Sequence, residues 1–303
     1  MEKLKYKISS RATILLGRES VSKVESAIIE LIKNSYDADA DICFVYFDTK
    51  DNCLYLIDNG IGMTKKVIED YWMTIGTDNK KKEYVSPRGR IKSGEKGIGR
   101  FALDRLGSIC ELYSKNNEED LIRWKTNWNK FEESGKMLDD INAEFEFLPS
   151  KLISFLPRKV KESIDKLGIN KNIKLNFEKG TIIKILDLRD DWTENKILSL
   201  KKSLEFLIPP MEQDSFILCI QRGDESEYQV VENSFSEGYD YKIESEFDGE
   251  YFNINLFRKE FDLDRIPEDI FLTKAFSKFP YRKEDFYKSN LFFKYKISIC
   301  CTR

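Results

Sequence analysis

Apolar side chains recur at helical spacing between residues 21 and 36, and this pattern predicts an amphipathic helix. The apolar positions of this helix are Val24, Ala27, Ile28, Leu31 and Ile32. Glu30 and Asn34 are four residues apart, so they lie one turn apart on one side of the helix. Both flank the apolar stripe rather than lying opposite it, which places two polar groups beside the buried face.

Runs of β-branched and aromatic residues predict the strands of a sheet. The first two runs, 41–47 and 53–58, follow the helix and are joined by a turn at 49–52. Another clear strand, 180–186, contains Thr181 and three isoleucines. The remaining predicted elements are helices at 67–75, 100–106, 157–167 and 193–207, and strands at 108–114, 120–128, 216–221, 228–231, 241–246, 252–257 and 294–301. This mixture of elements predicts an α+β fold.

The chain length of 303 residues favours roughly two domains. Pro209 and Pro210 end the last predicted helix of the first part, because proline disfavours helical backbone in the residue before it. We therefore expect a first domain at 1–210 and a smaller, sheet-rich second domain at 211–303. Residues 115–179 alternate charged and apolar segments, and we interpret them as a variable insertion or an extended part of the first domain.

Composition excludes several classes of function. The chain has no histidine, which rules out Ser-His catalysis, His-ligated zinc and a phosphorylated histidine within this chain. Its net charge of -3 gives no global attraction to nucleic acid. The six cysteines form no CxxC pair and mostly lie in apolar runs, so buried thiols in a reducing cytoplasm are expected. We find neither an apolar run long enough to span a membrane nor a signal peptide.

Two glycine-rich segments carry candidate binding chemistry. The first, Asp58-Asn59-Gly60-Ile61-Gly62, directly follows the strand at 53–58. The second, residues 94–99 with the sequence GEKGIG, precedes a predicted helix and follows a polar, lysine-rich loop at 78–92 that we expect to be mobile. Glycines at these positions permit a loop whose N–H groups point at phosphate oxygens, with a helix N-terminus behind them.

Four segments resemble the motifs of the GHKL ATPases, the class that groups gyrase B, the ninety-kilodalton heat-shock chaperone, histidine kinases and MutL. They are residues 30–38 (ELIKNSYDA), 58–64 (DNGIGMT), 94–99 (GEKGIG) and Gly180-Thr181, and they occur in the order of the family. The resemblance implies a Bergerat-fold sandwich, in which helices cover one face of a mixed, mainly antiparallel sheet. The amino-acid sequences of the motifs are most similar to those of bacterial MORC-like proteins, which are often found in defence islands.

The resemblance implies ATP and Mg²⁺ as cofactors and gives the first two motifs their roles. Asn34 is implied as the Mg²⁺ ligand, which suits a hard cation that takes oxygen ligands. Glu30 is implied as the catalytic base that orients the water attacking the γ-phosphate. Asp58 accepts hydrogen bonds only, so it is implied to select the amine of adenine. On the residues alone, Asn34 and Glu30 also fit a solvated helix face, and Asp58 fits a turn. Further ATP contacts of these motifs are implied for Asp37, Ala38, Gly60, Gly62 and Met63.

The resemblance places the lid of the site in the third motif. Its ATP contacts are implied for Gly94, Lys96, Gly97, Ile98, Gly99 and Arg100. Thr77 and Lys80, in the segment before the lid, resemble the MutL and MORC branches more loosely. Thr181, in the fourth motif, is implied to bind Asp58 or a water beside adenine. Solvated surface cations and a plain strand threonine are the alternative interpretations of Lys96, Arg100 and Thr181.

Together these features predict an Mg²⁺-dependent ATPase whose lid closes on ATP. We expect a homodimer that uses residues 6–19 as a swapped or docking segment and acts on DNA or a partner protein, in phage defence. Two alternatives stay open: a nucleotide-gated binding module with little turnover, and a kinase that passes phosphate to a histidine of a separate protein. In relatives a following transducer domain supplies a lysine to the γ-phosphate. We expect such a domain from 211 onward, but it is short for a complete transducer and we identify no such lysine in it.

Overall fold

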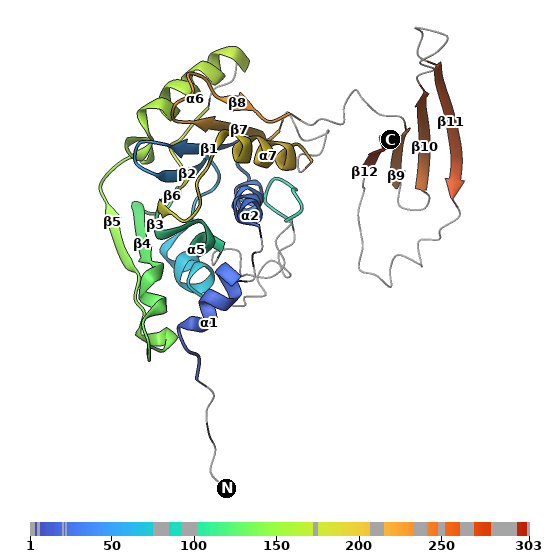
Figure 1. Ribbon diagram of the computed structural model, residues 1–303. Helices are drawn as coiled ribbons and strands as arrows, with labels where there is room; N and C mark the ends of the chain where they lie inside the picture. Colours follow the sequence, from blue (N-terminus) through green and yellow to red (C-terminus); the bar gives the residue numbers. More distant parts are fainter. Residues whose placement is uncertain are drawn as a thin grey trace. The chain divides into compact units, whose positions relative to one another are not determined.

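The computed structural model describes residues 4, 7–19, 21, 23–74, 85–92, 102–171, 175–206, 215–232, 241–247, 252–260, 270–279 and 296–301. The chain divides into two units (Figure 1). The first comprises Met1–Leu204 with Asp214–Val231, and the second comprises Glu205–Gln213 with Glu232–Arg303. Among the described residues, the first unit contains an eight-stranded sheet and the second a four-stranded sheet.

The sheet of the first unit has the strand order β5-β4-β3-β6-β2-β1-β7-β8. Its strands are β1 (Ile42–Asp48), β2 (Cys53–Asp58), β3 (Gly107–Lys115), β4 (Leu121–Asn127), β5 (Glu144–Leu148), β6 (Gly180–Leu188), β7 (Ile217–Arg222) and β8 (Gln229–Val230). β1 and β7 pair in parallel, and the other neighbouring pairs are antiparallel. This mixed, mainly antiparallel sheet with its helices confirms the α+β prediction.

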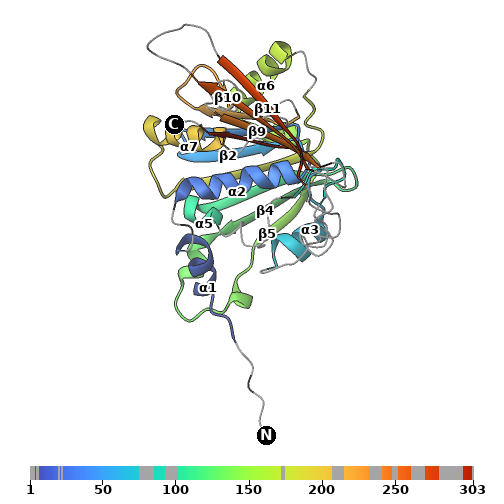
Figure 2. The ribbon, with the colours of Figure 1, turned by 90° about the vertical axis from the view of Figure 1, so that its right-hand side faces the viewer.

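The helix predicted at 21–36 forms as α2 (Val24–Asp37), and its predicted apolar positions are buried. Figure 2 shows α2 lying across the front of the strands. The other helices and helical turns of the unit are α1 (Arg11–Ile14), η1 (Leu15–Glu19), α3 (Lys65–Val67), η2 (Ile68–Trp72), α5 (Ala102–Leu106), η4 (Trp128–Glu132), η5 (Leu138–Asp140), η6 (Leu152–Phe155), α6 (Arg158–Lys171) and α7 (Glu194–Glu205). None of the helices in the described parts of the chain has the length and apolar character needed to cross a membrane.

Helices cover both faces of the sheet at its centre. One face belongs to a core cluster shared by β1, β2 and α6, which includes Ile42, Phe44, Tyr46, Ile57, Val160, Ile164 and Leu167. Because neighbouring side chains of a strand point to opposite faces, Asp58 points away from this cluster, and there it bonds Ser35 of α2. Thus α2 covers the second face. The resemblance implied helices on one face only, and α6 adds a layer that it did not predict.

Residues 115–179 extend the sheet through β4 and β5. β4 pairs with β3, and β5 pairs with β4 at the end of the strand order. The helix predicted at 157–167 forms as α6 and packs on the core cluster. β5 has no counterpart among the predicted strands, because its exposed glutamates and flanking turns weaken the apolar signal.

β7 and β8 belong to the first sheet, although the boundary predicted at 210/211 puts both strands in the second domain. β7 pairs with β1 along its whole length, from Ile42 opposite Ile217 onward. Local sequence predicts a strand, but it does not show which distant strand will be its partner. The sheet of the second unit has the order β11-β10-β9-β12, with β9 (Tyr241–Phe247), β10 (Phe252–Glu260), β11 (Ile270–Phe279) and β12 (Lys296–Cys301). β11 was not predicted, and a transducer-like role of this unit stays a prediction.

Candidate functional site

Asp58 stands at the end of β2, where it is only 7% exposed. Its Oδ2 accepts a hydrogen bond from Ser35 Oγ at 3.0 Å, and its Oδ1 accepts one from the Gly60 N–H at 2.9 Å. Burial raises the pKa of Asp58 to about 6, while hydrogen bonds from Gly60, Ser35 and the Thr181 backbone oppose this rise. At neutral pH the side chain is therefore mostly an ionised, acceptor-only group in a buried setting.

The turn after β2 is fixed to the end of α2. The Ile61 N–H donates to the Ala38 carbonyl oxygen at 2.9 Å. Asn59 Oδ1 accepts hydrogen bonds from the backbone N–H groups that begin β1. A Cβ added at Gly60 would lie 2.6 Å from the Ala38 carbonyl oxygen. Gly60 is therefore required by the approach of two protein segments, a constraint that the resemblance to adenine-contacting glycines did not reveal.

Gly62 and Met63 are held by the end of β3. Gly62 has a φ of 71°, and a Cβ there would fall 2.1 Å from the Lys115 carbonyl oxygen. The Met63 N–H donates to Ser114 Oγ at 2.8 Å, and Asn116 Nδ2 donates to the Met63 carbonyl oxygen at 2.8 Å. Ser114 and Asn116 were not among the predicted site residues, since only the sheet brings them to this turn.

Thr181 lies directly opposite Asp58 in the antiparallel pair of β2 and β6. The Thr181 backbone bonds the Asp58 carboxylate, and its Oγ1 lies 3.2 Å from Ser114 Oγ. Gly180 has a φ of 134°, and a Cβ there would fall 2.1 Å from the Asp58 carbonyl oxygen. The fourth motif is thus packed against the second motif by the sheet.

Helix α2 contains most of the first motif and packs beside the buried Asp58 carboxylate. Asp37 is buried and Asn34 is half-buried. Glu30 is more open, because its side chain is 43% exposed and accepts a hydrogen bond from Lys33 Nζ at 2.9 Å. Ser35, which the sequence did not single out, lies on α2 and donates a hydrogen bond to Asp58. The predicted catalytic and metal-binding side chains therefore lie on the helix that packs against the predicted adenine-binding group.

Residues 85–92, the described part of the loop before the third motif, are fastened to the end of α2. Ser86 Oγ donates to Asp39 Oδ1 at 2.6 Å, and the Arg88 N–H donates to Asp39 Oδ2 at 3.2 Å. The Arg90 guanidinium donates to the carbonyl oxygens of Tyr36 and Ala40. This part is a pinned turn rather than the mobile loop expected at 78–92. The predicted contacts Thr77, Lys80, Gly94, Lys96, Gly97, Ile98, Gly99 and Arg100 lie outside the described residues.

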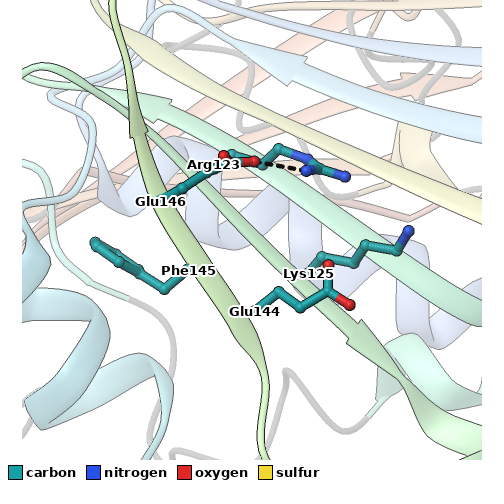
Figure 3. Close-up of a pocket in the computed structure, with 5 residues that line it drawn as sticks. All are labelled: Arg123, Lys125, Glu144, Phe145 and Glu146. Atoms are coloured by element: carbon teal, nitrogen blue, oxygen red, sulfur yellow. Dashed lines mark hydrogen bonds and ion pairs between the residues drawn. The ribbon is translucent and has the colours of Figure 1, made fainter.

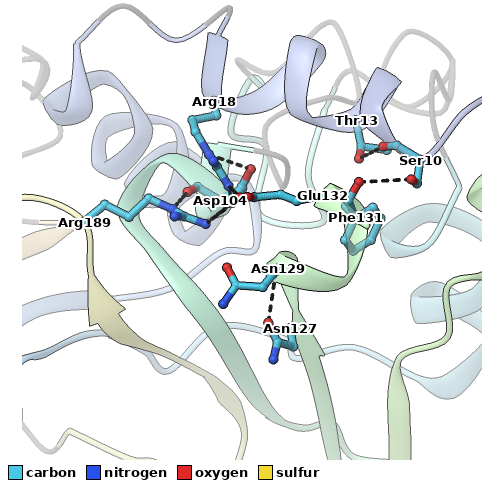
Figure 4. Close-up of polar contacts among 9 residues, drawn as sticks. All are labelled: Ser10, Thr13, Arg18, Asp104, Asn127, Asn129, Phe131, Glu132 and Arg189. Carbon is cyan, nitrogen blue, oxygen red and sulfur yellow. Dashed lines mark hydrogen bonds and ion pairs between the residues drawn. The ribbon is translucent and has the colours of Figure 1, made fainter. Parts of the chain in front are cut away.

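Charged side chains form a network around the buried Asp104, which follows the third motif in the sequence (Figure 4). The side chain of Asp104 in α5 is 3% exposed and accepts hydrogen bonds from Arg18 Nε at 3.1 Å and Nη2 at 2.7 Å. Arg189, beyond the end of β6, donates to the same carboxylate at 2.8 Å. Arg18 also contacts Glu132 at 2.6 Å. The network therefore joins the N-terminal turn η1, helix α5 and the end of β6.

The described residues offer a cavity of about 200 Å³ beside β4 and β5 (Figure 3). Its lining residues are Arg123, Lys125, Glu144, Phe145 and Glu146, and none of them belongs to the predicted nucleotide site. The same described part of the chain has no cluster of three or more Cys, Asp or Glu suited to a metal ion. Mg²⁺ held by Asn34 needs no such cluster, because this ion keeps waters and phosphate oxygens as ligands. The acceptor-only carboxylate of Asp58 likewise fits the amine of adenine.

Residues 21–154 match the family model described as histidine kinase-, DNA gyrase B-, and HSP90-like ATPase. This segment is a GHKL-type ATPase domain. The GHKL match contains α2, β1, β2 and the turn after Asp58, so the family and the geometry above concern the same residues. Thr181 lies beyond the match, and the sheet supplies its link to Asp58. A particular closeness to MORC-like proteins stays a prediction.

A shorter stretch resembles a protein of a different description. It is 31% identical over 86 residues to "Putative type II restriction enzyme HgiDII" from Herpetosiphon aurantiacus. The match covers 28% of this chain and 14% of that protein. Because the chain spans only this small part of the relative, the match does not transfer the activity of the whole relative.

Proposed function

We propose that this GHKL domain binds ATP through Asp58 and hydrolyses it in an Mg²⁺-dependent reaction. Members of its superfamily bind ATP, which supports ATP as the ligand of this domain. The observation that carries the proposal is the buried Asp58 carboxylate, held in place by Ser35 and Gly60. This group accepts the N–H of the adenine amine, whereas the carbonyl oxygen that guanine has at that position would meet a second acceptor.

Asn34 and Glu30 complete the proposed site on α2. Asn34 would hold Mg²⁺ through its neutral side-chain oxygen, and the ion would supply positive charge beside the phosphates. Glu30 accepts a proton from the attacking water as the water oxygen bonds to the γ-phosphorus and ADP leaves. The 43% exposure of the Glu30 side chain supports this role, because water can reach its carboxylate.

A nucleotide-gated binding module with little turnover is the second candidate. The ion pair between Lys33 and Glu30 favours it, since the Glu30 carboxylate is already bonded to an ammonium group and must leave it before it can contact the attacking water. Such a pair on an exposed helix surface stabilises by only about 0.2–0.5 kcal/mol. Binding of ATP is therefore sufficient to separate the two groups, and hydrolysis stays the first candidate.

Calorimetry with a non-hydrolysable ATP analogue and Mg²⁺ tests the binding step. The wild type should release heat, and the matching GTP analogue should give none. Phosphate release by the wild type and by Glu30→Gln then tests the chemical step. Binding without any phosphate release by the wild type would support the binding module, and no heat from the wild type would refute the proposed site.

We also propose that ATP closes the lid and drives homodimerisation, and that the dimer acts on DNA or a partner protein in the cytoplasm, in phage defence. The similarity of 86 residues to a putative type II restriction enzyme makes DNA the first substrate to test. Size-exclusion chromatography with and without the ATP analogue tests the dimer. DNA affinity measured over a range of salt concentrations tests contact with phosphates, because such contacts weaken steeply with salt. Transfer of labelled phosphate to a separate protein would instead support the kinase alternative.

A further inference from the structure

The Arg90 guanidinium lies against the C-terminal end of α2, the helix that contains most of the first motif. Its Nη1 donates to the carbonyl oxygens of Tyr36 at 3.2 Å and Ala40 at 2.7 Å. The last turn of α2 contains no basic residue of its own. Because the end of a helix carries partial negative charge on its last carbonyl groups, Arg90 supplies a cation that stabilises this end from another segment of the chain.

Arg90 is also fixed to the segment that enters β7. Its Nη2 donates to the Ser215 carbonyl oxygen at 2.7 Å. The guanidinium carbon lies 4.7 Å from the centroid of the Tyr36 ring and 5.7 Å from that of the Phe216 ring, and the two rings contact each other edge to face. Since β7 pairs with β1 along its whole length, Ser215 lies beside a firmly held strand. One side chain therefore joins the end of α2 to the start of β7.

The backbone of Arg90 is held at the same place by a second group of bonds. Asp39 is buried, and its carboxylate accepts hydrogen bonds from Ser86 Oγ at 2.6 Å and from the Arg88 N–H at 3.2 Å. The Arg90 N–H donates to Ser86 Oγ at 3.0 Å, and the Ser86 N–H donates to the Arg90 carbonyl oxygen at 2.8 Å. The guanidinium thus projects from a fixed backbone, so less conformational freedom is lost when it binds its three carbonyl oxygens.

The stretch of chain that Arg90 holds contains Ala38, which positions the turn after Asp58. The Ile61 N–H donates to the Ala38 carbonyl oxygen at 2.9 Å, and a Cβ on Gly60 would lie 2.6 Å from the same oxygen. The Gly60 N–H in turn donates to Asp58 Oδ1 at 2.9 Å. A shift of the Ala38 carbonyl would therefore move the backbone that binds the Asp58 carboxylate.

We infer that Arg90 is a positioning residue for ATP binding, which acts through Ala38 on the turn that follows Asp58. The inference rests on the proposed function, because that function assigns Asp58 to adenine. Both terminal nitrogens of Arg90 already donate to backbone carbonyl oxygens, so its role is to hold the site rather than to contact the nucleotide. Arginine suits this place because its planar group presents donors in several fixed directions, whereas lysine presents a point charge.

Residue-resolved hydrogen exchange of the full chain without nucleotide tests the link from Arg90 to the turn. Arg90→Met keeps an apolar stem and removes the donors, so the Ile61 amide should exchange about tenfold faster. The Met63 amide donates to Ser114 on β3, so it is the internal control and should change less than about twofold. Unchanged exchange at Ile61, or equal acceleration at both amides, would overturn the inference.

Arg90→Lys keeps the positive charge and is the conservative variant. It should show the same pattern with a smaller acceleration at Ile61, of about threefold, because one ammonium group replaces the planar fork. If Arg90→Met does not fold, unchanged exchange at Ile61 in Arg90→Lys would overturn the inference.

Calorimetry with Mg²⁺ tests the consequence for binding. Arg90→Met should bind a non-hydrolysable ATP analogue and ADP more weakly by the same factor, about tenfold, because the adenine end of the site is affected. Lys159→Met is the matched control. Lys159 in α6 also donates to two backbone carbonyl oxygens, those of Gly223 and Glu225, but α6 packs on the face of the sheet opposite α2. This variant should change either affinity less than about twofold.

The outcomes separate the role of Arg90 from the proposed function. A loss confined to the ATP analogue would make Arg90 a contact of the γ-phosphate, and equal losses in Arg90→Met and Lys159→Met would reflect general destabilisation. Either result would overturn the inference, as would equal affinity of the wild type and Arg90→Met. A wild type that binds neither nucleotide would refute the proposed function instead, and the exchange measurement would still decide whether Arg90 holds the turn.

Discussion

Asp58→Asn should make the fold more stable at neutral pH while it weakens ATP binding. The pKa of Asp58 is about 6 in the folded protein, above the ordinary value of 3.8, because the carboxylate is buried. A pKa difference of that size opposes folding by about 3 kcal/mol at pH 7.5, taking about 1.36 kcal/mol for each pKa unit. A neutral asparagine removes this penalty.

The hydrogen bonds that join residue 58 to Gly60 and Ser35 can survive this substitution. The remaining side-chain oxygen can accept from the Gly60 N–H, and the new amide N–H can donate to Ser35 Oγ. Ser35 Oγ can in turn donate to the Leu31 carbonyl oxygen, which lies at 3.4 Å. Because bonds to a neutral acceptor are weaker, we expect a net gain of about 1–3 kcal/mol, and each kcal/mol corresponds to about 2–4 °C in Tm.

The sign of the pH dependence separates this explanation from a general change in packing. Since the folded pKa lies above the unfolded value, the folded state binds more protons between pH 3.8 and about pH 6. The wild type should therefore gain about 1 kcal/mol relative to Asp58→Asn when the pH falls from about 7.5 to about 5. Urea denaturation of both proteins at the two pH values measures how the difference in their free energies of unfolding changes with pH. A variant that is less stable at pH 7.5, with an unchanged pH dependence, would refute the reasoning.

The same substitution should reduce affinity for an ATP analogue by about 10- to 100-fold, because a hydrogen bond to a charged acceptor contributes about 1.5–3 kcal/mol. In the variant a single oxygen would have to serve both the Gly60 N–H and the adenine amine. Calorimetry at pH 7.5 measures the loss, and unchanged affinity would refute the role of Asp58 in adenine binding.

Three further predictions address other parts of the domain. Glu30→Gln should lower phosphate release about 10²- to 10⁴-fold with ATP-analogue affinity unchanged, and full activity in a phosphate assay would exclude Glu30 as the base. Ser114→Ala removes the bond to the Met63 N–H and should cost about 1 kcal/mol in urea denaturation together with some ATP affinity, so loss of neither would contradict its role in the turn. Asp104→Ala leaves Arg18 and Arg189 without their buried partner and should cost about 3–5 kcal/mol in the same assay, whereas a change below about 1 kcal/mol would show that the network is dispensable.

Elements with strong local signals were predictable from the sequence. The apolar stripe of α2 and the continuous apolar runs of β1 and β2 specify their own secondary structure, because each has a period or a composition that few alternatives share. β7 was predicted as a strand but assigned to the wrong domain, since its partner β1 is distant in sequence. β5 was missed because two of its five residues are exposed glutamates, which a half-buried edge strand tolerates on its outer face.

In the candidate site, too, some residues were predictable from the sequence and others were not. Asp58 and the glycines around it stand out because they form a turn directly after an apolar strand. Ser35 and Ser114 do not stand out, because serine is common on helix surfaces and in strands, and only the packed sheet shows what they bond. The glycines have a further constraint that the sequence did not reveal, because Gly60 and Gly62 leave room for carbonyl oxygens of the protein itself. Their contacts with ATP stay predictions. A motif can therefore be located from sequence while the constraint that maintains it is visible only in the fold.

The energetic cost of Asp58 links the stability of the domain to its ligand. Burial of the carboxylate opposes folding by about 3 kcal/mol at neutral pH. A ligand present at 100 times its Kd stabilises the folded state by about 2.7 kcal/mol, which is of the same size. An adenine amine that donates to the carboxylate also lowers its pKa, because a hydrogen bond to the charged form favours that form. Saturation with the ATP analogue should therefore both raise the stability of the wild type and flatten its pH dependence above pH 5. At the same analogue concentration Asp58→Asn should be stabilised less, and its pH dependence should not change. A wild type that is stabilised by the analogue but keeps its full pH dependence would place the bound adenine away from Asp58.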